Sequence, residues 1–381
     1  MPRKIKVAHI VTLLEFGGAQ QNTLYTVEHL DRNRFEPLLL CGRGAYLDGD
    51  AEKSGYPTIF INSLDRPLRP LRDMLAFLEI FFVLKREKPD IVHTHSSKAG
   101  VLGRWAAKCA GVPFIVHTFH GFGFTSRQNI WLRWTFILIE KISAYAAHVL
   151  LAVSQANREE ALRHGIGRPD KYRLLRSGIA RPLFQSLSRR PNAPEGLPLT
   201  PDLRLVTTIG PFKPQKNLSD FVAMAGRVHA KHPEARFLIV GDGELRPLLE
   251  QEIERHGLTA VFYLPGWRRD IPHIMMRSNI FVLTSLWEGL PRALVEAMCA
   301  ALPCVANAVD GVNDIVNDGA NGFLVPPRRP DLTAERVNHL LENPNFASEM
   351  GHRARQSIGD EFDIDEMVRR QEELYSAAVH P

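Results

Sequence analysis

Apolar and polar positions along the chain fall into two recurring patterns. Short apolar runs, such as 5–14 and 280–283, are typical of strands buried in a sheet. Longer segments with apolar residues at helical spacing, such as 71–87, follow many of these runs. Strands that alternate with helices in this way are typical of parallel sheets covered by helices. The pattern therefore predicts an α/β protein.

The same pattern gives an order of elements for both halves of the chain. The first half is predicted to contain a helix that follows a glycine loop at 15–21 and ends near Leu30, and further helices at 71–87, 100–110 and 131–147. Its predicted strands are 5–14, 36–41, 58–61, 90–94, 114–118, 148–154 and 172–175. The second half is predicted to contain strands at 203–209, 236–240, 260–264, 280–283 and 303–306, and helices at 218–230, 244–256, 271–276, 332–341 and 362–377.

A proline-rich segment separates the two halves. Four prolines and no apolar periodicity between 188 and 201 predict a linker. We therefore expect an N-terminal doubly wound domain at 1–187, a linker at 188–202, a C-terminal doubly wound domain at 203–360 and a terminal helix at 361–381. Because doubly wound sheets bind ligands at the carboxyl ends of their strands, the cleft between the two domains is the expected site.

Composition narrows the class of protein. The 381 residues carry a net charge of +5, which favours an anionic ligand or an anionic membrane surface. The basic residues are scattered and form no long run, so we expect no nucleic acid partner. The four cysteines include no Cys-x-x-Cys pair, which predicts reduced thiols without a disulfide or zinc site. Without a signal-peptide pattern or a long apolar stretch, the protein is expected to be cytoplasmic.

The segment 284–298 carries the strongest chemical signal. An apolar strand is followed by a Gly-Leu-Pro turn, in which Pro291 suits the first position of a helix. A helix N-terminus after a strand binds anions through free backbone N–H groups. Glu288 lies in the loop, and Glu296 lies on an apolar helix face where an unpaired charge is costly. Ligand hydroxyls would serve as the partner that Glu296 needs. The alternative is that Glu288 caps the helix and Glu296 pairs with an arginine; we favour the ligand site because all these features occur together.

This pattern resembles the Glu-x7-Glu signature of retaining glycosyltransferases of family 4, which have the GT-B fold of two facing Rossmann-like domains. The resemblance continues through 302–305 and 318–327. It implies that Glu288 binds sugar hydroxyls and Glu296 binds the ribose of a nucleotide-sugar donor. It also implies that the loop residues Gly289, Leu290 and Pro291 contact the donor.

Two further loops resemble the family's diphosphate-binding loops. Gly17 and Gly18 follow a predicted strand and precede a helix, where glycine allows close approach of a phosphate. Lys216 matches the family's lysine, but Pro211 stands where an arginine is usual. Either Lys213 supplies the missing charge or the diphosphate is held with one cation fewer, and we favour Lys213. A solvated basic loop is a reasonable alternative for Lys213 and a weaker one for Lys216.

The segment 266–270 resembles the family's nucleobase-binding loop. This implies that Trp267 and Arg268 contact the donor. Backbone groups make most such contacts in the family, so residue identity says little about them. Trp267 also fits a packing role, because buried aromatic residues mostly pack against other side chains.

Two histidine-containing segments follow predicted strands. His120 resembles the family's histidine that contacts the donor sugar, although a lone histidine near a strand end is often structural. His95, Ser96 and Lys98 are assigned to the acceptor side. Strand side chains alternate between faces, and we interpret His93 and His95 as pointing to opposite faces. That interpretation excludes a two-histidine metal site, so neither a metal nor another cofactor is expected.

The resemblance also implies a reaction. Catalytic roles fall to Glu288, His120 and Lys216 in the metal-independent, retaining transfer of a hexosyl or N-acetylhexosaminyl group to a glycan hydroxyl. The donor is expected to be a UDP-sugar, on family frequency. The segments 94–100 and 117–122 resemble bacterial enzymes of capsule, exopolysaccharide and O-antigen assembly. Such enzymes act on lipid-linked oligosaccharides at the inner face of the plasma membrane.

One predicted helix bears on membrane contact. Trp131, Arg133, Trp134, Phe136 and Lys141 fit a basic-aromatic helix that lies peripherally on an anionic membrane. The same residues fit ordinary amphipathic packing, and we favour a half-buried core helix.

Two other functional classes stay open. A sugar-nucleotide epimerase or a dehydrogenase would carry a G-x-G-x-x-G or Tyr-x-x-x-Lys motif, and the sequence contains neither. A non-catalytic partner subunit would be indicated by loss of Glu288, Glu296 or Lys216, and all three are present. Pro211 alone favours that alternative.

Overall fold

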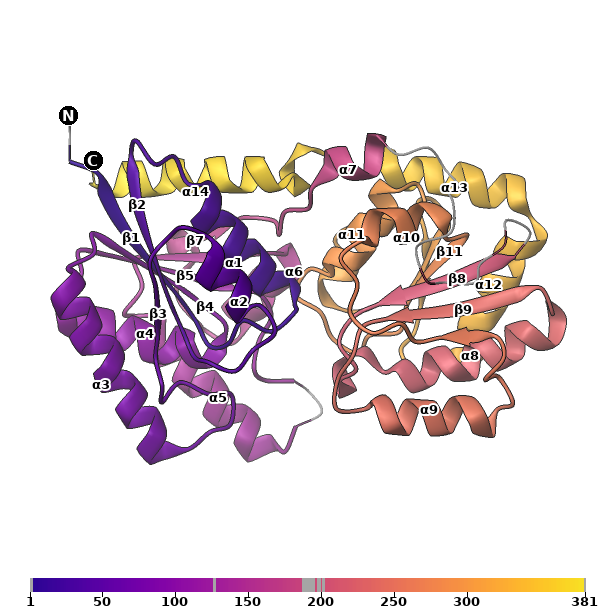
Figure 1. The fold of residues 1–381 in the computed structure, drawn as a ribbon, viewed down its shortest axis with the longest axis horizontal. Helices are drawn as coiled ribbons and strands as arrows, with labels where there is room; N and C mark the ends of the chain where they lie inside the picture. Colours follow the sequence, from indigo (N-terminus) through magenta and orange to yellow (C-terminus); the bar gives the residue numbers. More distant parts are fainter. Residues whose placement is uncertain (1–2, 126–127, 187–195, 197–199, 201–202, 380–381) are drawn as a thin grey trace. The chain divides into compact units, whose positions relative to one another are not determined.

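The computed structural model describes residues 3–379 except 126–127, 187–195, 197–199 and 201–202 (Figure 1). The chain divides into two compact units, the first formed by 1–178 and 364–381 and the second by 179–363. The short helix α7 (Arg181–Ser186), which follows this boundary, therefore belongs to the second unit and not to the expected domain 1–187. Most of the predicted linker at 188–202 lies outside the described residues.

The first unit is a doubly wound parallel sheet. Its described strands are ordered β3-β2-β1-β4-β5-β6-β7, and all neighbours are parallel. The strands are β1 (Ile5–Val11), β2 (Phe35–Cys41), β3 (Thr58–Phe60), β4 (Ile91–His95), β5 (Phe114–Phe119), β6 (Val149–Ala152) and β7 (Tyr172–Leu174). The helices are α1 (Gly18–His29), α2 (Asp48–Lys53), α3 (Pro70–Glu87), α4 (Ser97–Ala110), α5 (Ile130–Ser143), α6 (Gln155–Arg163) and α14 (Ile364–Val379).

Successive side chains of a strand point to opposite faces of the sheet, and the two faces pack against different helices. Ala8 and Ile10 of β1 pack in the apolar cluster with α3 and α4. Val11, on the other face, packs in the cluster that contains Val27 of α1. The terminal helix α14 also lies on the α1 side, where Nε2 of Gln371 donates to Oγ1 of Thr26 at 3.2 Å. The C-terminal helix is therefore part of the packing of the N-terminal sheet (Figure 1).

The second unit repeats the architecture. Its described strands are ordered β10-β9-β8-β11-β12-β13 and are all parallel. The strands are β8 (Arg204–Ile209), β9 (Ala235–Val240), β10 (Phe262–Tyr263), β11 (Ile280–Leu283), β12 (Cys304–Asn307) and β13 (Phe323–Val325). Besides α7, the helices are α8 (Leu218–Lys231), α9 (Arg246–Arg255), α10 (Ile271–Arg277), α11 (Arg292–Cys299), α12 (Pro330–Glu342) and α13 (Pro344–Gln356).

Most predicted elements are present, with ends shifted by a few residues. The sequence analysis missed β13 and the helices α2, α6, α7 and α13. These elements are either short or mostly polar: α6 buries only Asn157 and Ala161. Such helices depend on the packing of a few small side chains, which leaves little apolar periodicity to detect.

Candidate functional site

Each sheet has a switch point near its middle. This is a pair of adjacent strands from which the chain continues toward opposite edges of the sheet. In the second unit this point lies between β8 and β11, and in the first between β1 and β4. The loops that leave the two strands of a switch point run in opposite directions and open a crevice at the carboxyl edge of the sheet, where ligands bind. Several of the predicted site residues lie at these two places.

Lys216 and Glu288 lie on the two sides of the switch point in the second unit. Lys216 is in the loop after β8, and Glu288 is in the loop after β11. The Lys216 Nζ lies 2.5 Å from the Glu288 Oε1. Their side chains are only 13% and 7% exposed, so the two charges are largely desolvated and neutralise each other. The N-terminus of α11 has no side-chain cap, so Glu288 does not cap this helix, which was the alternative considered from the sequence.

The loop that carries Glu288 is held by three polar residues that sequence reasoning missed. The backbone N–H of Glu288 donates to Oδ2 of Asp310 at 2.8 Å. The Asn307 side chain donates to the carbonyl oxygens of Thr284 and Ser285, at 2.7 and 3.1 Å. Nε2 of Gln215 donates to the carbonyl oxygen of Trp287 at 2.8 Å. Asn307 was detectable in principle, because it is a polar residue at the end of a buried strand.

Glu296 lies in α11, the helix that follows the loop of Glu288. Its carboxylate forms an ion pair with Arg292 at 3.1 Å, so the arginine partner considered from the sequence is present. Burial raises the pKa of Glu296, and the charge of Arg292 opposes that rise. The prediction for Pro291 was wrong by one position: it is the N-cap, and α11 begins at Arg292.

The loop after β8 is shaped by Gly210. A Cβ at this position would lie 2.9 Å from Cε of Lys216, so the glycine leaves room for the lysine stem to cross the backbone. Lys213 is partly buried in the same loop, and Pro211 occupies the position where an arginine was expected. Whether Lys213 supplies a charge to a ligand stays a prediction.

The predicted nucleobase loop lies next to the carboxyl end of β9. The Gly241 N–H donates to the carbonyl oxygen of Gly266 at 3.0 Å. Arg268 makes a two-bond ion pair with Asp270, at 2.8 and 2.7 Å. That pair lowers the pKa of Asp270, chiefly through the hydrogen bond from Arg268. Trp267 is partly buried, so packing and ligand contact both stay open for it.

In the first unit, Gly17 and Gly18 form the N-terminus of α1, with Gly17 as the N-cap. The predicted acceptor-side residues lie across the switch point, where His95 ends β4 and Ser96 and Lys98 follow it. Ser96 hydrogen-bonds through its Oγ to Oγ1 of Thr12 at 2.8 Å. The ammonium group of Lys98 lies 3.1 Å from Asp65 and 2.5 Å from Asp73. The charge of Lys98 is thus neutralised by its own unit.

The histidines of β4 correct the sequence analysis. His93 and His95 are two residues apart, so they share a face of the strand. Their ring centroids lie 4.2 Å apart, and the expectation of opposite faces was wrong. His9, on β1, completes the cluster: among the described residues, ligand atoms of these three side chains lie within 4.8 Å of one another. The sequence signal for His9 was a polar residue inside an apolar strand.

Hydrogen bonds already occupy most nitrogens of this cluster. Nδ1 of His9 lies 3.1 Å from Nε2 of His95. In His93, Nδ1 lies 2.5 Å from the Tyr375 hydroxyl and Nε2 lies 2.7 Å from Oγ1 of Thr118. Both nitrogens of His95 and both nitrogens of His93 thus already have a hydrogen-bond partner within the protein. The arrangement fits a hydrogen-bond network better than a metal centre.

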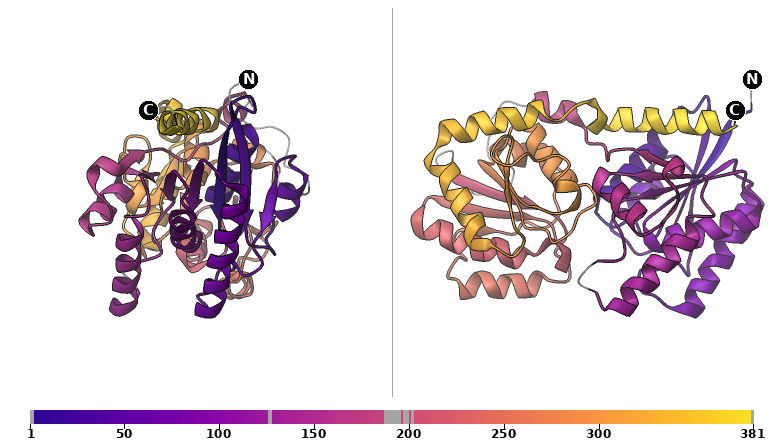
Figure 2. Two further views of the ribbon diagram at one scale, coloured as in Figure 1. Left: turned by 90° about the vertical axis from the view of Figure 1, so that its left-hand side faces the viewer. Right: turned by 180° about the vertical axis from the view of Figure 1, so that it is seen from behind.

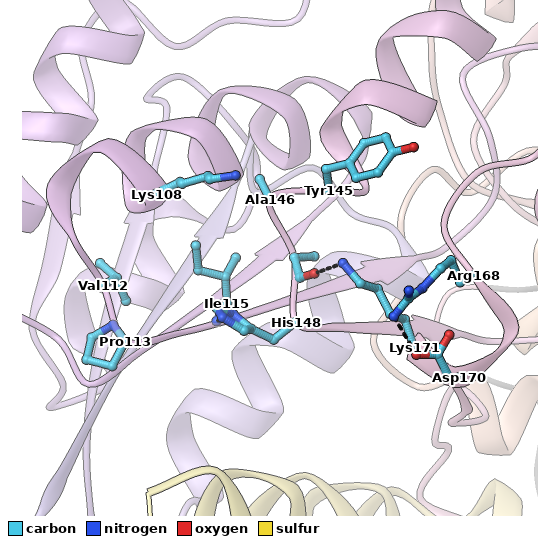
Figure 3. A pocket seen from close by; sticks show the side chains of 11 residues that line it. Lys108, Val112, Pro113, Ile115, Tyr145, Ala146, His148, Arg168, Asp170 and Lys171 are labelled. Carbon is cyan, nitrogen blue, oxygen red and sulfur yellow. Dashed lines mark hydrogen bonds and ion pairs between the residues drawn. The ribbon is translucent and has the colours of Figure 1, made fainter.

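A pocket of about 450 Å³ opens elsewhere in the first unit (Figure 3). Its lining includes Ile115 and His148, which lie at the amino ends of β5 and β6. Lys171 points toward the carbonyl oxygen of Ala147 there and donates to it at 2.7 Å (Figure 3). This pocket lies at the opposite edge of the sheet from the histidine cluster, so we do not include it in the candidate site.

Comparisons with known proteins agree along most of the chain. Residues 17–178 match the family described as "Glycosyl transferase 4-like domain", and 190–357 match "Glycosyl transferases group 1". The chain is 32% identical over 380 residues to UDP-Gal:alpha-D-GlcNAc-diphosphoundecaprenol alpha-1,3-galactosyltransferase of Escherichia coli, covering 98% of this chain and 97% of that protein.

Two further likenesses are more distant. The chain is 20% identical over 321 residues to the capsular polysaccharide biosynthesis glycosyltransferase CapM of Staphylococcus aureus, covering 82% of this chain and 83% of that protein. The structure resembles that of Anabaena HepE in complex with UDP and glucose, with a TM-score of 0.83 and 20% identity over 98% of this chain and 100% of that one.

Proposed function

Since the chain belongs to the group 1 glycosyltransferases with a 4-like N-terminal domain, we propose that it transfers a hexosyl or N-acetylhexosaminyl group from a UDP-sugar to a lipid-linked glycan. The chain is a glycosyltransferase of the GT-B fold, as the sequence predicted. The finer part of the proposal is that transfer retains the anomeric configuration and needs no metal ion.

The observation that carries the proposal is the Lys216–Glu288 pair at a topological switch point. A nucleotide sugar presents an anionic diphosphate next to a ring of hydroxyl groups. The diphosphate is a partner for the Lys216 ammonium, and the sugar hydroxyls are partners for the Glu288 carboxylate. Donor binding would thus separate the pair while giving each charged group a new partner, so neither is left buried and unpaired.

The same residues suggest how transfer proceeds. Negative charge develops on the diphosphate as the glycosidic bond breaks, and Lys216 would stabilise it. Glu288 would hold the sugar so that the acceptor hydroxyl approaches the face from which the diphosphate leaves. The departing phosphate oxygen then takes the proton of that hydroxyl. A lysine at this position reduces the need for a metal cation on the diphosphate.

The Escherichia coli relative supports a choice of substrates. Its name gives UDP-Gal as the donor and alpha-D-GlcNAc-diphosphoundecaprenol as the acceptor. We extend to this chain the chemical classes, a UDP-hexose and a saccharide on a polyprenyl diphosphate. The name of CapM supports a role in surface-polysaccharide synthesis.

A lipid-linked acceptor requires access to a membrane surface. Among the helices in the described part of the chain, none has the length and apolar content to cross a bilayer. The helices α3 and α5 instead lie on the same side of the first unit, with α4 packed against both (Figures 1 and 2). Their exposed apolar residues are Leu71, Met74, Leu75, Leu78 and Phe82 on α3, and Ile130, Trp131, Leu132, Trp134, Leu138, Ile139 and Ile142 on α5.

For the segment 131–147 the sequence left two interpretations, a membrane-surface helix and a half-buried core helix, and the exposure of α5 bears on both. The inner face of α5 packs as a core helix would, through the buried Ile137. Trp131, however, is 80% exposed, and Trp134 is also exposed. Exposed apolar side chains on helices that also carry exposed lysines, such as Lys85 and Lys141, are suited to an anionic membrane surface. We propose that α3 and α5 hold the enzyme peripherally at the inner face of the plasma membrane.

A binding experiment tests the donor class. UDP, GDP and ADP are each titrated against the purified protein with and without EDTA, and the melting temperature is recorded. We expect UDP alone to raise it, with no effect of EDTA, because a ligand that binds only the folded state stabilises that state. Equal shifts with all three nucleotides, or a shift that needs a divalent metal, would contradict the proposal.

A further inference from the structure

Three histidines of the first unit form a continuous hydrogen-bonded chain. His9 is on β1, His95 is the last residue of β4, and His120 directly follows β5. Nδ1 of His9 lies 3.1 Å from Nε2 of His95, and Nδ1 of His95 lies 3.2 Å from Nε2 of His120. The rings of His9 and His95 are within 10° of parallel, with centroids 5.4 Å apart, so the facing nitrogens lie close to the line between the centroids. This is the alignment of an N–H···N hydrogen bond.

The chain runs from the core of the sheet to its carboxyl edge. His9 and His95 are 0% and 4% exposed, and His120 is partly exposed. At the inner end, Nε2 of His9 is buried and has no hydrogen-bond partner within the described part of the chain. At the outer end, Nδ1 of His120 has no partner among the described residues either. The inner end is closed by protein, whereas the outer end is available to a ligand.

Each neutral imidazole carries a single N–H, which couples the three tautomers. If Nδ1 of His9 carries the proton, then His95 and His120 must also be protonated at Nδ1, because each Nε2 accepts a hydrogen bond. In the reverse sense all three carry the proton at Nε2. The first sense leaves a lone pair at the closed end, and the second leaves a buried N–H without an acceptor. Orphaned buried N–H groups are the rarer of the two, so the first sense is favoured.

We propose that His9 and His95 are positioning residues that fix His120 as a neutral Nδ1–H tautomer, which donates a hydrogen bond to an oxygen of the bound substrate. The oxygen belongs to a sugar hydroxyl or to the diphosphate, and this identification rests on the proposed function. His95 therefore acts through His120, although the sequence assigned it to the acceptor side. Removal of the chain would leave His120 free to take either tautomer.

Burial and the neighbouring groups support a neutral chain. Desolvation lowers the pKa of His9 to about 3 and that of His120 to about 4, so protonation to the cation is disfavoured at neutral pH. His93 lies beside the chain without joining it, since its nitrogens face Tyr375 and Thr118. His117 lies on the other face of the sheet, where Nδ1 pairs with Oγ1 of Thr94 at 2.9 Å.

Tautomers are read directly from the ring nitrogens of ¹⁵N-histidine-labelled protein by NMR at pH 7. For the wild type we expect His9, His95 and His120 all to be protonated at Nδ1. His9→Leu, which removes the closed end without touching His120, should lower the Nδ1–H population of His120 at least twofold. His117→Leu removes an equally buried histidine outside the chain and should leave His120 unchanged. The proposal is overturned if His120 of the wild type is cationic or protonated at Nε2. It is also overturned if the Nδ1–H population of His120 is the same in His9→Leu as in the wild type.

A kinetic measurement adds a second readout. His95→Leu should lower kcat roughly tenfold with little change in the donor KM, since it disturbs orientation and leaves Lys216 and Glu288 intact. An unchanged kcat would contradict the positioning role. Failure of this inference is distinguishable from failure of the proposed function, because the tautomers are measured without substrate and UDP binding is measured independently. If His9→Leu does not fold, the wild-type tautomers still decide the sense of the chain.

Discussion

The Nζ of Lys216 lies 2.5 Å from Oε1 of Glu288, although the two residues belong to different loops, after β8 and β11. The strands β8 and β11 are parallel neighbours, so the loops that follow them start side by side. They then continue toward opposite edges of the sheet. Without ligand, each charge is the other's partner. On the proposal made above, donor binding would exchange these partners, which would explain how two charged groups are kept largely buried in a site for an anionic ligand.

The first prediction follows from this pairing. Lys216→Met should destabilise the second unit by about 3 kcal/mol, because breaking a buried pair leaves Glu288 uncompensated. The double variant Lys216→Met with Glu288→Gln should recover most of that stability, since no lone charge remains. Both variants should lose at least a hundredfold in transfer rate.

Urea unfolding of the wild type and both variants measures the stabilities, and single-turnover transfer measures the rates. Recovery of stability without recovery of transfer is the expected pattern. A double variant as active as the wild type would show that the pair is structural only.

The second prediction concerns the missing arginine at position 211. Lys213→Met should raise the donor KM about tenfold if Lys213 supplies the second cation, since a charged hydrogen bond contributes about 1.5–3 kcal/mol. Adding Pro211→Arg to that variant should restore the KM. Lys231, an exposed lysine at the far end of α8, serves as the control through Lys231→Met. Equal KM values for Lys213→Met and the control would remove Lys213 from the donor site.

The third prediction is a pH dependence of stability. Burial lowers the pKa of His9 to about 3 and of His120 to about 4, and holds those of His93, His95 and His117 well below the ordinary value. The unfolded chain takes up protons on these rings below about pH 6.5, whereas the folded chain does not. Stability is therefore complete above that pH and falls as the pH drops.

Each buried histidine contributes at most about 1.4 kcal/mol per pH unit to the dependence of the unfolding free energy on pH. Chemical unfolding at pH 7, 6 and 5 measures the total, and His117→Leu should reduce the slope by the contribution of one ring. A slope that is flat between pH 6.5 and 5 would mean that the rings are solvated in the folded protein.

The fourth prediction concerns the exposed faces of α3 and α5. Leu71→Ser combined with Trp131→Ser should weaken binding to vesicles that contain anionic phospholipid at least tenfold, since inserting each apolar side chain contributes about 1.5–3 kcal/mol. Leu248→Ser, an exposed leucine on α9, is the matched control and should have no effect. Co-sedimentation measures both. If the control weakens binding as much, the interaction is not specific to these helices.

The sequence predicted the fold because long apolar runs and amphipathic segments alternate regularly. It also located Glu288 and Lys216, since each lies between a recognisable strand and helix. Their contact was not predictable, because they are 72 residues apart and pairing depends on the order of strands in the sheet. The same applies to His9 and His95, which come within hydrogen-bond distance because β1 pairs with β4 and places His9 beside His93.

Other errors arose from local rules. Applying the two-residue period correctly would have placed His93 and His95 on one face. The helix α13 was missed because its 13 residues begin directly after α12 and bury mostly small side chains, including Ala347, Gly351 and Ala354. Pro291 was displaced by one position, which is the usual uncertainty of a helix end.

The most direct test of the account is a proton NMR assay of the reaction product. UDP-Gal and a synthetic α-GlcNAc-diphospholipid are incubated with the purified enzyme in EDTA, and the anomeric signals are followed. The account predicts a single new α-anomeric signal, which is absent with Glu288→Gln. A β-anomeric product, or no product from UDP-Gal or from other UDP-hexoses tested in the same way although UDP binds, would contradict it.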